Sequence, residues 1–222
     1  MTNGPTGRIV DGTTWKEFCD TLKSAGDVVL HGSREEDVLD RAEGFRYLSR
    51  LVRAALEAFV EHADPKAPVL FRPVHETAKM GADHPDNHYL WGRISGEYEY
   101  AIQGRRGTVP YLGFGTYAGF YGSGGRSAQT GFLEGSDLVL GPDGSFEIAV
   151  SRERREGNWL PMAADTSSLI VRQTFLDKAS ECAAELRIER VSGDGLPTPT
   201  TAARIDEGLM SAARLVWGAS MM

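Results

Sequence analysis

The middle of the chain alternates between hydrophobic and polar residues, which predicts β-strands. In the clearest stretch, residues 97–103, three apolar side chains alternate with three polar ones. Neighbouring side chains of a strand point to opposite faces, so one face meets a core and the other meets water or a polar cavity. Between residues 84 and 119, two turn-like segments, Ser95-Gly96 and 104–107, separate such runs. This pattern predicts three antiparallel strands in a meander.

Further strand patterns follow on both sides of this meander. Residues 69–74 form an apolar run that contains Pro73, which is typical of a strand at a sheet edge. Residues 138–150 resemble a hairpin around Pro142-Asp143-Gly144, and two more strands are expected in 168–176 and 184–191. Seven or eight strands with few helices between them favour an antiparallel β-sandwich or jelly roll over a parallel α/β sheet.

Helical spacing of apolar residues occurs near the two ends of the sequence. Thr14 to Glu17 has the pattern of a capping box, and the helix that it begins is expected to end at Gly26. A long amphipathic helix is expected over 34–63, ending before Pro65, and Thr200 or Thr201 is expected to cap a last helix. The long helix can pack on its own core or pair with a second subunit as a homo-oligomer.

These patterns together predict a mainly β protein with flanking helices, an α+β fold. The N-terminal helical hairpin, residues 1–66, is expected to pack on the sheet. The antiparallel sandwich occupies 67–192, and a linker with the C-terminal helix occupies 193–222. We expect the three parts to form one compact domain.

Several separated motifs resemble one known bacterial family, the domain of unknown function 1214. The resemblance runs from about Gly44 to about Arg190. It rests on Asp86-Asn87-x-Tyr89, Ile94-x-Gly96-x-Tyr98-x-Tyr100, Gly104-x-Arg106-Gly107, Gly157-Asn158-Trp159-Leu160-Pro161 and Leu169-Ile170-Val171-Arg172-Gln173. It implies a jelly-roll-like architecture, often joined to a second domain, and no established reaction.

Composition narrows the class of protein further. A chain of 222 residues with 41% hydrophobic residues can bury one substantial core. The formal net charge of −7 argues against a nucleic-acid partner. No apolar run is long enough for a membrane span and the start lacks a secretory pattern, so a cytoplasmic protein without a membrane partner is expected. Cys19 and Cys182 lack metal-type spacing and are expected to be buried thiols.

The candidate chemistry lies at the start of the predicted meander. His84 and Asp86 can move protons, and Tyr89 can donate a hydrogen bond. Arg106 and Arg172 can hold a carboxylate or an oxyanion through the planar guanidinium group. Each residue also has a structural explanation, such as a turn, a core position or an ion pair.

Four more residues complete the candidate site. Asn87 follows the proposed catalytic aspartate, and Tyr117 is one of the aromatic residues in a glycine-rich tract. Asn158 and Trp159 precede an apolar strand, where they can line a pocket or form a packing corner. We expect Asn158 and Arg172 to project into a cavity between the two sheets.

Three functions fit these residues. The first is a small-molecule-binding enzyme with cofactor-independent acid–base chemistry on a largely apolar substrate that carries a carboxylate or carbonyl. The second is a non-catalytic binding module or oligomeric interaction module. The third is a metal-dependent jelly-roll enzyme that uses His75, His84 or His88. The main hypothesis includes no metal site.

Overall fold

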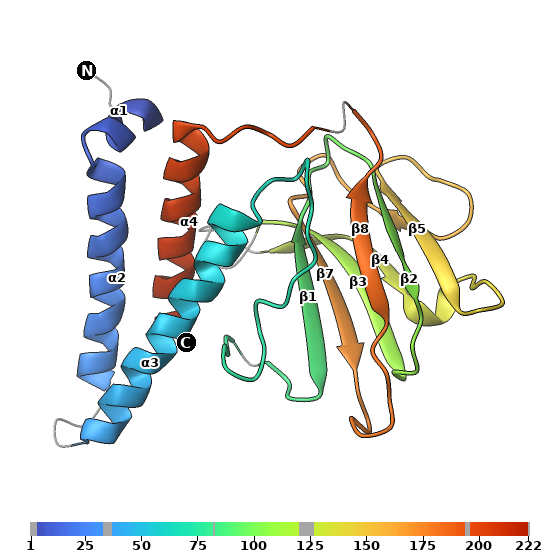
Figure 1. The fold of residues 1–222 in the computed structure, drawn as a ribbon, viewed down its shortest axis with the longest axis horizontal. Coiled ribbons are helices and arrows are strands. Elements are labelled where there is room, and N and C mark those ends of the chain that lie inside the picture. The colour runs from blue at the N-terminus through green and yellow to red at the C-terminus, as the bar shows by residue number, and fades with distance from the viewer. Residues whose placement is uncertain (1–3, 33–36, 82, 120–126, 194–195, 222) are drawn as a thin grey trace.

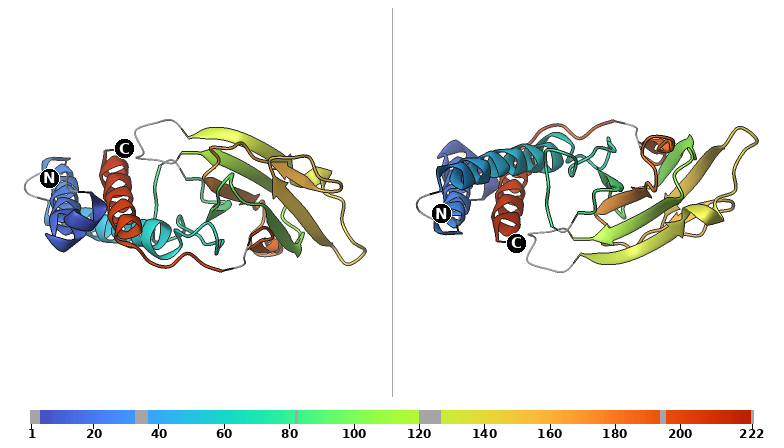
Figure 2. Two further views of the ribbon diagram at one scale, coloured as in Figure 1. Left: turned by 90° about the horizontal axis from the view of Figure 1, so that it is seen from above. Right: turned by 90° about the horizontal axis from the view of Figure 1, so that it is seen from below.

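The structure of the protein is a computed structural model that describes residues 4–32, 37–81, 83–119, 127–193 and 196–221. A helical layer lies beside a β-sandwich, and the two parts are joined by irregular segments (Figure 1). Views from above and below show the helices at one end of the molecule and the stacked sheets at the other (Figure 2). The first and last helices of the chain both lie in the helical layer.

Each sheet of the sandwich has four strands. The first sheet has the order β1-β7-β3-β4, and the second has the order β6-β5-β2-β8. All pairs are antiparallel except β5 with β6, which are parallel. The predicted α+β fold with an antiparallel sandwich is therefore confirmed. The strands are β1 (Asn87–Arg93), β2 (Tyr100–Arg105), β3 (Tyr111–Ala118), β4 (Ala128–Glu134), β5 (Ser145–Ser151), β6 (Trp159–Pro161), β7 (Ser168–Thr174) and β8 (Glu185–Arg190).

The predicted meander is wrong, because its three strands, β1, β2 and β3, alternate between the two sheets. β1 pairs with β7, whereas β2 pairs with β5 and β8 in the other sheet. The glycines that resembled hairpin turns instead allow close backbone approach. A Cβ at Gly96 would lie 2.3 Å from the Ala163 carbonyl oxygen, and one at Gly107 would lie 2.5 Å from the Cys182 carbonyl oxygen. The strand expected over 69–74 is reduced to a single bridge between Phe71 and Trp91.

The helices are α1 (Pro5–Val10), α2 (Thr13–Gly32), α3 (Val38–Leu56), the π-helical turn η1 (Glu57–Glu61) and α4 (Ala202–Ser220). α2 continues through Gly26, so the predicted end of this helix is wrong. The Thr14 hydroxyl is not the cap either, because it donates to the Asp206 carboxylate of α4. The N–H of Thr13 donates to Asp11 instead. A second capping-box pattern, Ser33 to Glu36, precedes the predicted long helix and lies outside the described residues.

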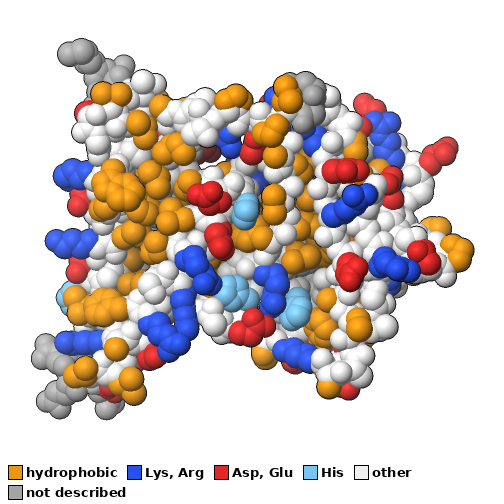
Figure 3. All heavy atoms as spheres, in the orientation of Figure 1, with side chains coloured by type: hydrophobic (Ala, Val, Ile, Leu, Met, Phe, Trp, Pro, Cys, Tyr) orange, Lys and Arg blue, Asp and Glu red, His pale blue; other side chains and the backbone are white. Residues whose placement is uncertain are grey.

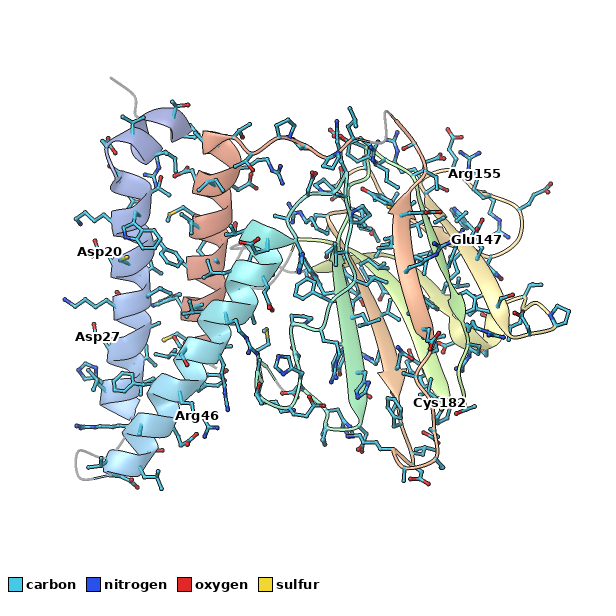
Figure 4. The ribbon with its side chains drawn as sticks, in the orientation of Figure 1. Asp20, Asp27, Arg46, Glu147, Arg155 and Cys182 are labelled. Carbon is cyan, nitrogen blue, oxygen red and sulfur yellow. The ribbon has the colours of Figure 1, made fainter. Side chains whose placement is uncertain are left out.

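A second hydrophobic core lies within the helical layer. The inward residues of α3, including Leu48, Leu51 and Ala55, pack with α2 and α4. Asp20 and Asp27 of α2 point away from the other helices (Figure 4). The two cores meet where the rings of Phe59, Phe71 and Trp91 contact each other edge to face, with centroid distances of 5.6 and 6.0 Å. A shared aromatic contact therefore joins the helical layer to β1.

Both cysteines are free and exposed, so the prediction of buried thiols is wrong. Cys19 lies on α2, where the neighbouring Phe18 takes the inward position. Cys182 lies in the connection from β7 to β8 (Figure 4). Among the described residues, no helix is long and apolar enough to span a membrane.

Candidate functional site

The space between the two sheets is filled by apolar side chains. The predicted site residues therefore do not meet in a cavity between the sheets. Phe114, Leu169 and Val171 of the first sheet are buried against Ile102, Ile148 and the other inward residues of the second. Arg172, one residue after Val171, is exposed on the opposite side of β7. The alternation of side chains along a strand requires this outward position.

The outer face of the first sheet brings four of the predicted residues together. Tyr89 of β1 lies directly opposite Arg172 of β7, and Asn87 lies opposite Thr174. Tyr117 of β3 projects from the same face, in register with Ser168. The candidate site is therefore a surface outside the sandwich.

A chain of contacts positions Tyr89 and Arg172. The Thr174 hydroxyl donates to Asn87 Oδ1 over 2.7 Å, and Asn87 Nδ2 donates to the Tyr89 hydroxyl oxygen over 2.7 Å. The guanidinium carbon of Arg172 lies 5.4 Å from the centre of the Tyr89 ring, a distance typical of a cation–π contact. Within the described part of the chain, Arg172 has no carboxylate within ion-pair distance. Its N–H groups can therefore bind a ligand.

Two glycines lie at the centre of this face and are covered by aromatic rings. A Cβ at Gly113 would lie 2.6 Å from the Tyr111 hydroxyl, and one at Gly115 would lie 2.7 Å from the Tyr117 hydroxyl. Both rings therefore lie close to the sheet, where a larger side chain would displace them. Phe132 of β4 lies beside them and is 45% exposed. We call this surface the aromatic face; it consists of Tyr89, Tyr111, Gly113, Gly115, Tyr117, Phe132, Ile170 and Arg172.

The electrostatics of the aromatic face are those of a partly shielded surface. Burial raises the pKa of the Tyr111 hydroxyl, and the nearby Glu134 carboxylate raises it further, while Arg172 opposes the shift. The tyrosine therefore stays neutral near pH 7 and acts as a hydrogen-bonding group. Arg172 supplies a positive charge within this set.

The outer face of the second sheet is charged instead. Gln103 of β2 lies between Glu147 of β5 and Arg187 of β8 and is hydrogen bonded to both. Glu147 is labelled in Figure 4, and Figure 3 shows side chains of both charges over β8, β2 and β5. Polar groups on this face bind one another, which is typical of a solvent-facing surface.

His84 and Asp86 lie in the turn before β1 and are exposed on the protein surface. His84 Nδ1 accepts the backbone N–H of Asp86 over 3.2 Å. The Asp86 carboxylate lies 3.5 Å from Lys178 Nζ, in an ion pair exposed on both sides. The structure gives both residues a local structural role, and their catalytic role stays a prediction.

Three other predicted residues bind the backbone or side chains of the protein itself. Arg106 donates to the Val109 carbonyl over 2.8 Å, and burial lowers the pKa of its guanidinium. Asn158 binds both the N–H and the carbonyl of Val139 and also the carbonyl of Glu147. The indole of Trp159 donates to Ser151 Oγ over 3.1 Å. All three lie away from the aromatic face, and Asn158 forms a packing corner, the alternative that its position before an apolar strand had left open.

Metal-type side chains and a surface hollow are the two other features that could form a site. In the described ranges, no group of three or more His, Cys, Asp or Glu side chains is arranged to hold a metal ion. A polar hollow of about 250 Å³ lies at the start of β2, between Glu97, Glu99, Arg152 and Ser192. Part of its wall is held by an ion pair between Glu99 and Arg155 (Figure 4). It contains none of the predicted site residues.

Sequence reasoning missed three residues on the outer face of the first sheet. Tyr111 belongs to a strand whose partners were not predicted correctly, and Phe132 belongs to a glycine-rich tract that was expected to be a loop rather than a strand, so their shared face with Tyr89 was not recognised. Arg93 lies four residues after Tyr89, and the strand period of two places both on the same face. This alternation could have placed Arg93 on the same face as Tyr89 from the sequence alone.

Comparisons with known proteins identify structural relatives without an assigned activity. The crystal structure of an uncharacterised protein from Burkholderia cenocepacia matches with 50% sequence identity and a TM-score of 0.90. The match covers 98% of this chain and 60% of the longer protein, so the chain spans about three fifths of that relative. A Vibrio parahaemolyticus protein matches with 14% identity over 69% of this chain and 44% of its own, with a TM-score of 0.42. No family model and no curated protein matches the chain.

Proposed function

We propose that the protein binds a planar, largely apolar organic anion on the aromatic face, with Arg172 holding its carboxylate. One observation carries this proposal. An exposed guanidinium lies over the Tyr89 ring, among aromatic side chains, without a carboxylate partner among the described residues. Aromatic rings favour flat apolar ligands, and the planar fork of arginine matches the two oxygens of a carboxylate.

Tyr89 adds a second polar contact for the ligand. Its hydroxyl oxygen accepts from Asn87, so its own proton remains available for donation. The hydrogen bond from Thr174 to Asn87 orients the amide and thereby the tyrosine. A ligand with a carboxylate near Arg172 and a carbonyl or hydroxyl near Tyr89 would use both groups.

The test is a binding screen that compares aromatic carboxylates, such as naphthoate and indole carboxylates, with the corresponding primary amides. Ligand-observed NMR and isothermal titration calorimetry would measure affinity for wild type, Arg172→Met and the control Arg187→Met on the charged face of the second sheet. We expect Arg172→Met to bind at least about tenfold more weakly, because a charge-assisted hydrogen bond is lost. Equal affinity in wild type and Arg172→Met, with both folded by circular dichroism, would refute the proposal.

Acid–base catalysis on the bound molecule is the second candidate. The free hydroxyl proton of Tyr89 beside the positive charge of Arg172 favours it, since this pair can polarise a carbonyl oxygen. Incubation of identified ligands in deuterated water would show exchange of the proton next to the carbonyl. Loss of exchange in Tyr89→Phe with unchanged binding would support catalysis, whereas no exchange in wild type would exclude this reaction.

Three broader assignments complete the proposal. The free, exposed Cys19 and Cys182 fit a reducing compartment such as the cytoplasm. Membership of the domain of unknown function 1214 family rests on the sequence motifs. Self-association through helix 34–63 is also a proposal, although much of the apolar side of α3 already packs on α2 and α4. Analytical ultracentrifugation over a range of concentrations would test it.

A further inference from the structure

Arg93 lies at the end of β1, where the helical layer meets the outer face of the first sheet. It projects from the same face as Tyr89 and lies opposite Ser168, which in turn lies opposite Tyr117. Trp91, the preceding outward residue, packs against Phe59 and Phe71. The Arg93 side chain is therefore partly buried in the junction between β1 and the helices.

The Arg93 guanidinium, unlike those of the partly buried Arg8 and Arg204, lacks a bonding partner among the residues that the structure describes. Across the described ranges, no hydrogen bond and no ion pair within 4 Å reaches it. Arg8, by contrast, is paired with Glu17 and Asp206, which raise its pKa. Arg204 donates to the Thr198 carbonyl over 2.6 Å.

The surroundings of Arg93 exclude part of the water around its side chain without replacing the lost hydrogen bonds. Burial lowers the pKa of the Arg93 guanidinium, and Glu207 on α4 opposes this shift from beyond ion-pair distance. Glu207 is itself exposed to solvent. An arginine in such a position keeps its charge, because its intrinsic pKa is too high for loss of the proton. A partly desolvated charge without a partner is unfavourable until an anion binds to it.

We infer that Arg93 is an anion-binding residue that receives a carboxylate or phosphate group at the junction between β1 and α4. Ser168, directly opposite Arg93 on β7, carries a hydroxyl group on that face and adds hydrogen-bonding capacity near the anion. Ser168 is 2% exposed, so this pair of residues is shielded from bulk water on the side of β7. Shielding strengthens the attraction between the guanidinium and the anion.

This inference does not depend on the ligand proposed for Arg172. Arg93 and Arg172 lie two rows apart on the sheet, which corresponds to roughly 13 Å along the strand direction. Small anions therefore test Arg93 without occupying the aromatic rings. Failure of the aromatic-carboxylate screen would leave the result at Arg93 unaffected.

The experiment measures arginine side-chain signals and thermal stability with sodium phosphate, sodium acetate and sodium chloride at equal ionic strength. In 15N-labelled protein, the Nε–Hε signal of Arg93, assigned from its loss in Arg93→Lys, is expected to shift saturably with phosphate or acetate but not chloride. A response to phosphate alone would indicate a phosphate-bearing ligand, and a response to acetate alone a carboxylate. No saturable shift with either anion would overturn the inference.

Variants provide an independent measurement. Arg93→Met is expected to raise the midpoint of thermal unfolding without anion, because it removes an unpaired charge. In an Arg172→Met background, which removes the other proposed carboxylate site, Arg93→Met is expected to abolish the anion-dependent rise. Glu207→Gln is expected to tighten anion binding, since it removes a competing negative charge. Arg187→Met, on the other sheet, should respond like wild type. An Arg93→Met protein that keeps the full anion-dependent rise would contradict the inference.

Discussion

The two sheets of the sandwich share one core but present different outer faces. On the second sheet, Arg187, Gln103 and Glu147 form a row of side chains that bind one another. On the first sheet, the equivalent row contains Tyr89, Arg172 and Gly113, and the N–H groups of Arg172 have no carboxylate partner among the described residues. The first face therefore combines the exposed Phe132 ring and partly buried tyrosines with an arginine that has no carboxylate partner among the described residues.

Two glycines, Gly104 on the inner face of the second sheet and Gly113 on the outer face of the first, have different neighbours. A Cβ at Gly104 of β2 would lie 2.2 Å from the Glu185 carbonyl oxygen, which is fixed in the backbone of β8. A Cβ at Gly113 of β3 would meet the hydroxyl end of the Tyr111 side chain, which can rotate away. Gly104 is therefore enclosed by backbone, whereas Gly113 is covered by a movable ring.

The largest expected effect follows from this difference. Gly104→Ala is expected to lower the free energy of unfolding by about 2–3 kcal/mol, because the strand pair must shift to admit the methyl group. Gly113→Ala is expected to cost less than about 1 kcal/mol, since only a flexible side chain moves. Urea denaturation would measure both values. Equal losses in the two variants would show that the rings over Gly113 are as firmly held as backbone.

A change at Asn158 should have an intermediate effect and separates its structural role from its predicted ligand role. Asn158→Ala removes three hydrogen bonds to the backbone of Val139 and Glu147 at the edge of the second sheet. We expect a loss of about 2 kcal/mol in the free energy of unfolding and no change in affinity for ligands of the aromatic face. Weaker binding with unchanged stability would instead restore Asn158 to the site.

The smallest expected effects on stability come from side chains on the outer faces of the two sheets. Phe132→Ser and Glu147→Ser should each change the free energy of unfolding by no more than about 0.5 kcal/mol. Phe132→Ser should nevertheless reduce the fluorescence of a hydrophobic dye bound to the native protein, whereas Glu147→Ser should not. Equal dye binding by wild type and Phe132→Ser would show that the aromatic face is not an apolar binding surface.

The site could be predicted only in part, because sequence patterns identify a face without identifying its neighbours. Tyr89 and Arg172 were recognised from their local sequence patterns. They are direct neighbours only because of the register in which β1 pairs with β7. Asn158 and Arg106 had similar local patterns, yet the fold directs both to the protein's own backbone. Tyr111 of β3 and Phe132 of β4 were missed because the pairing of these two strands places both rings on one face. No local pattern shows that pairing.

The sequence by itself determined six of the strands, namely β1, β2, β3, β5, β7 and β8, and the existence of the terminal helices, because alternation and helical spacing are local properties of the chain. It also indicated that Arg172 interrupts an apolar strand. The tertiary structure decided which sheet each strand joins and where each outward side chain lies. Pairing depends on residues as distant as Tyr89 and Arg172, and their contact arises only when β1 and β7 adopt one register.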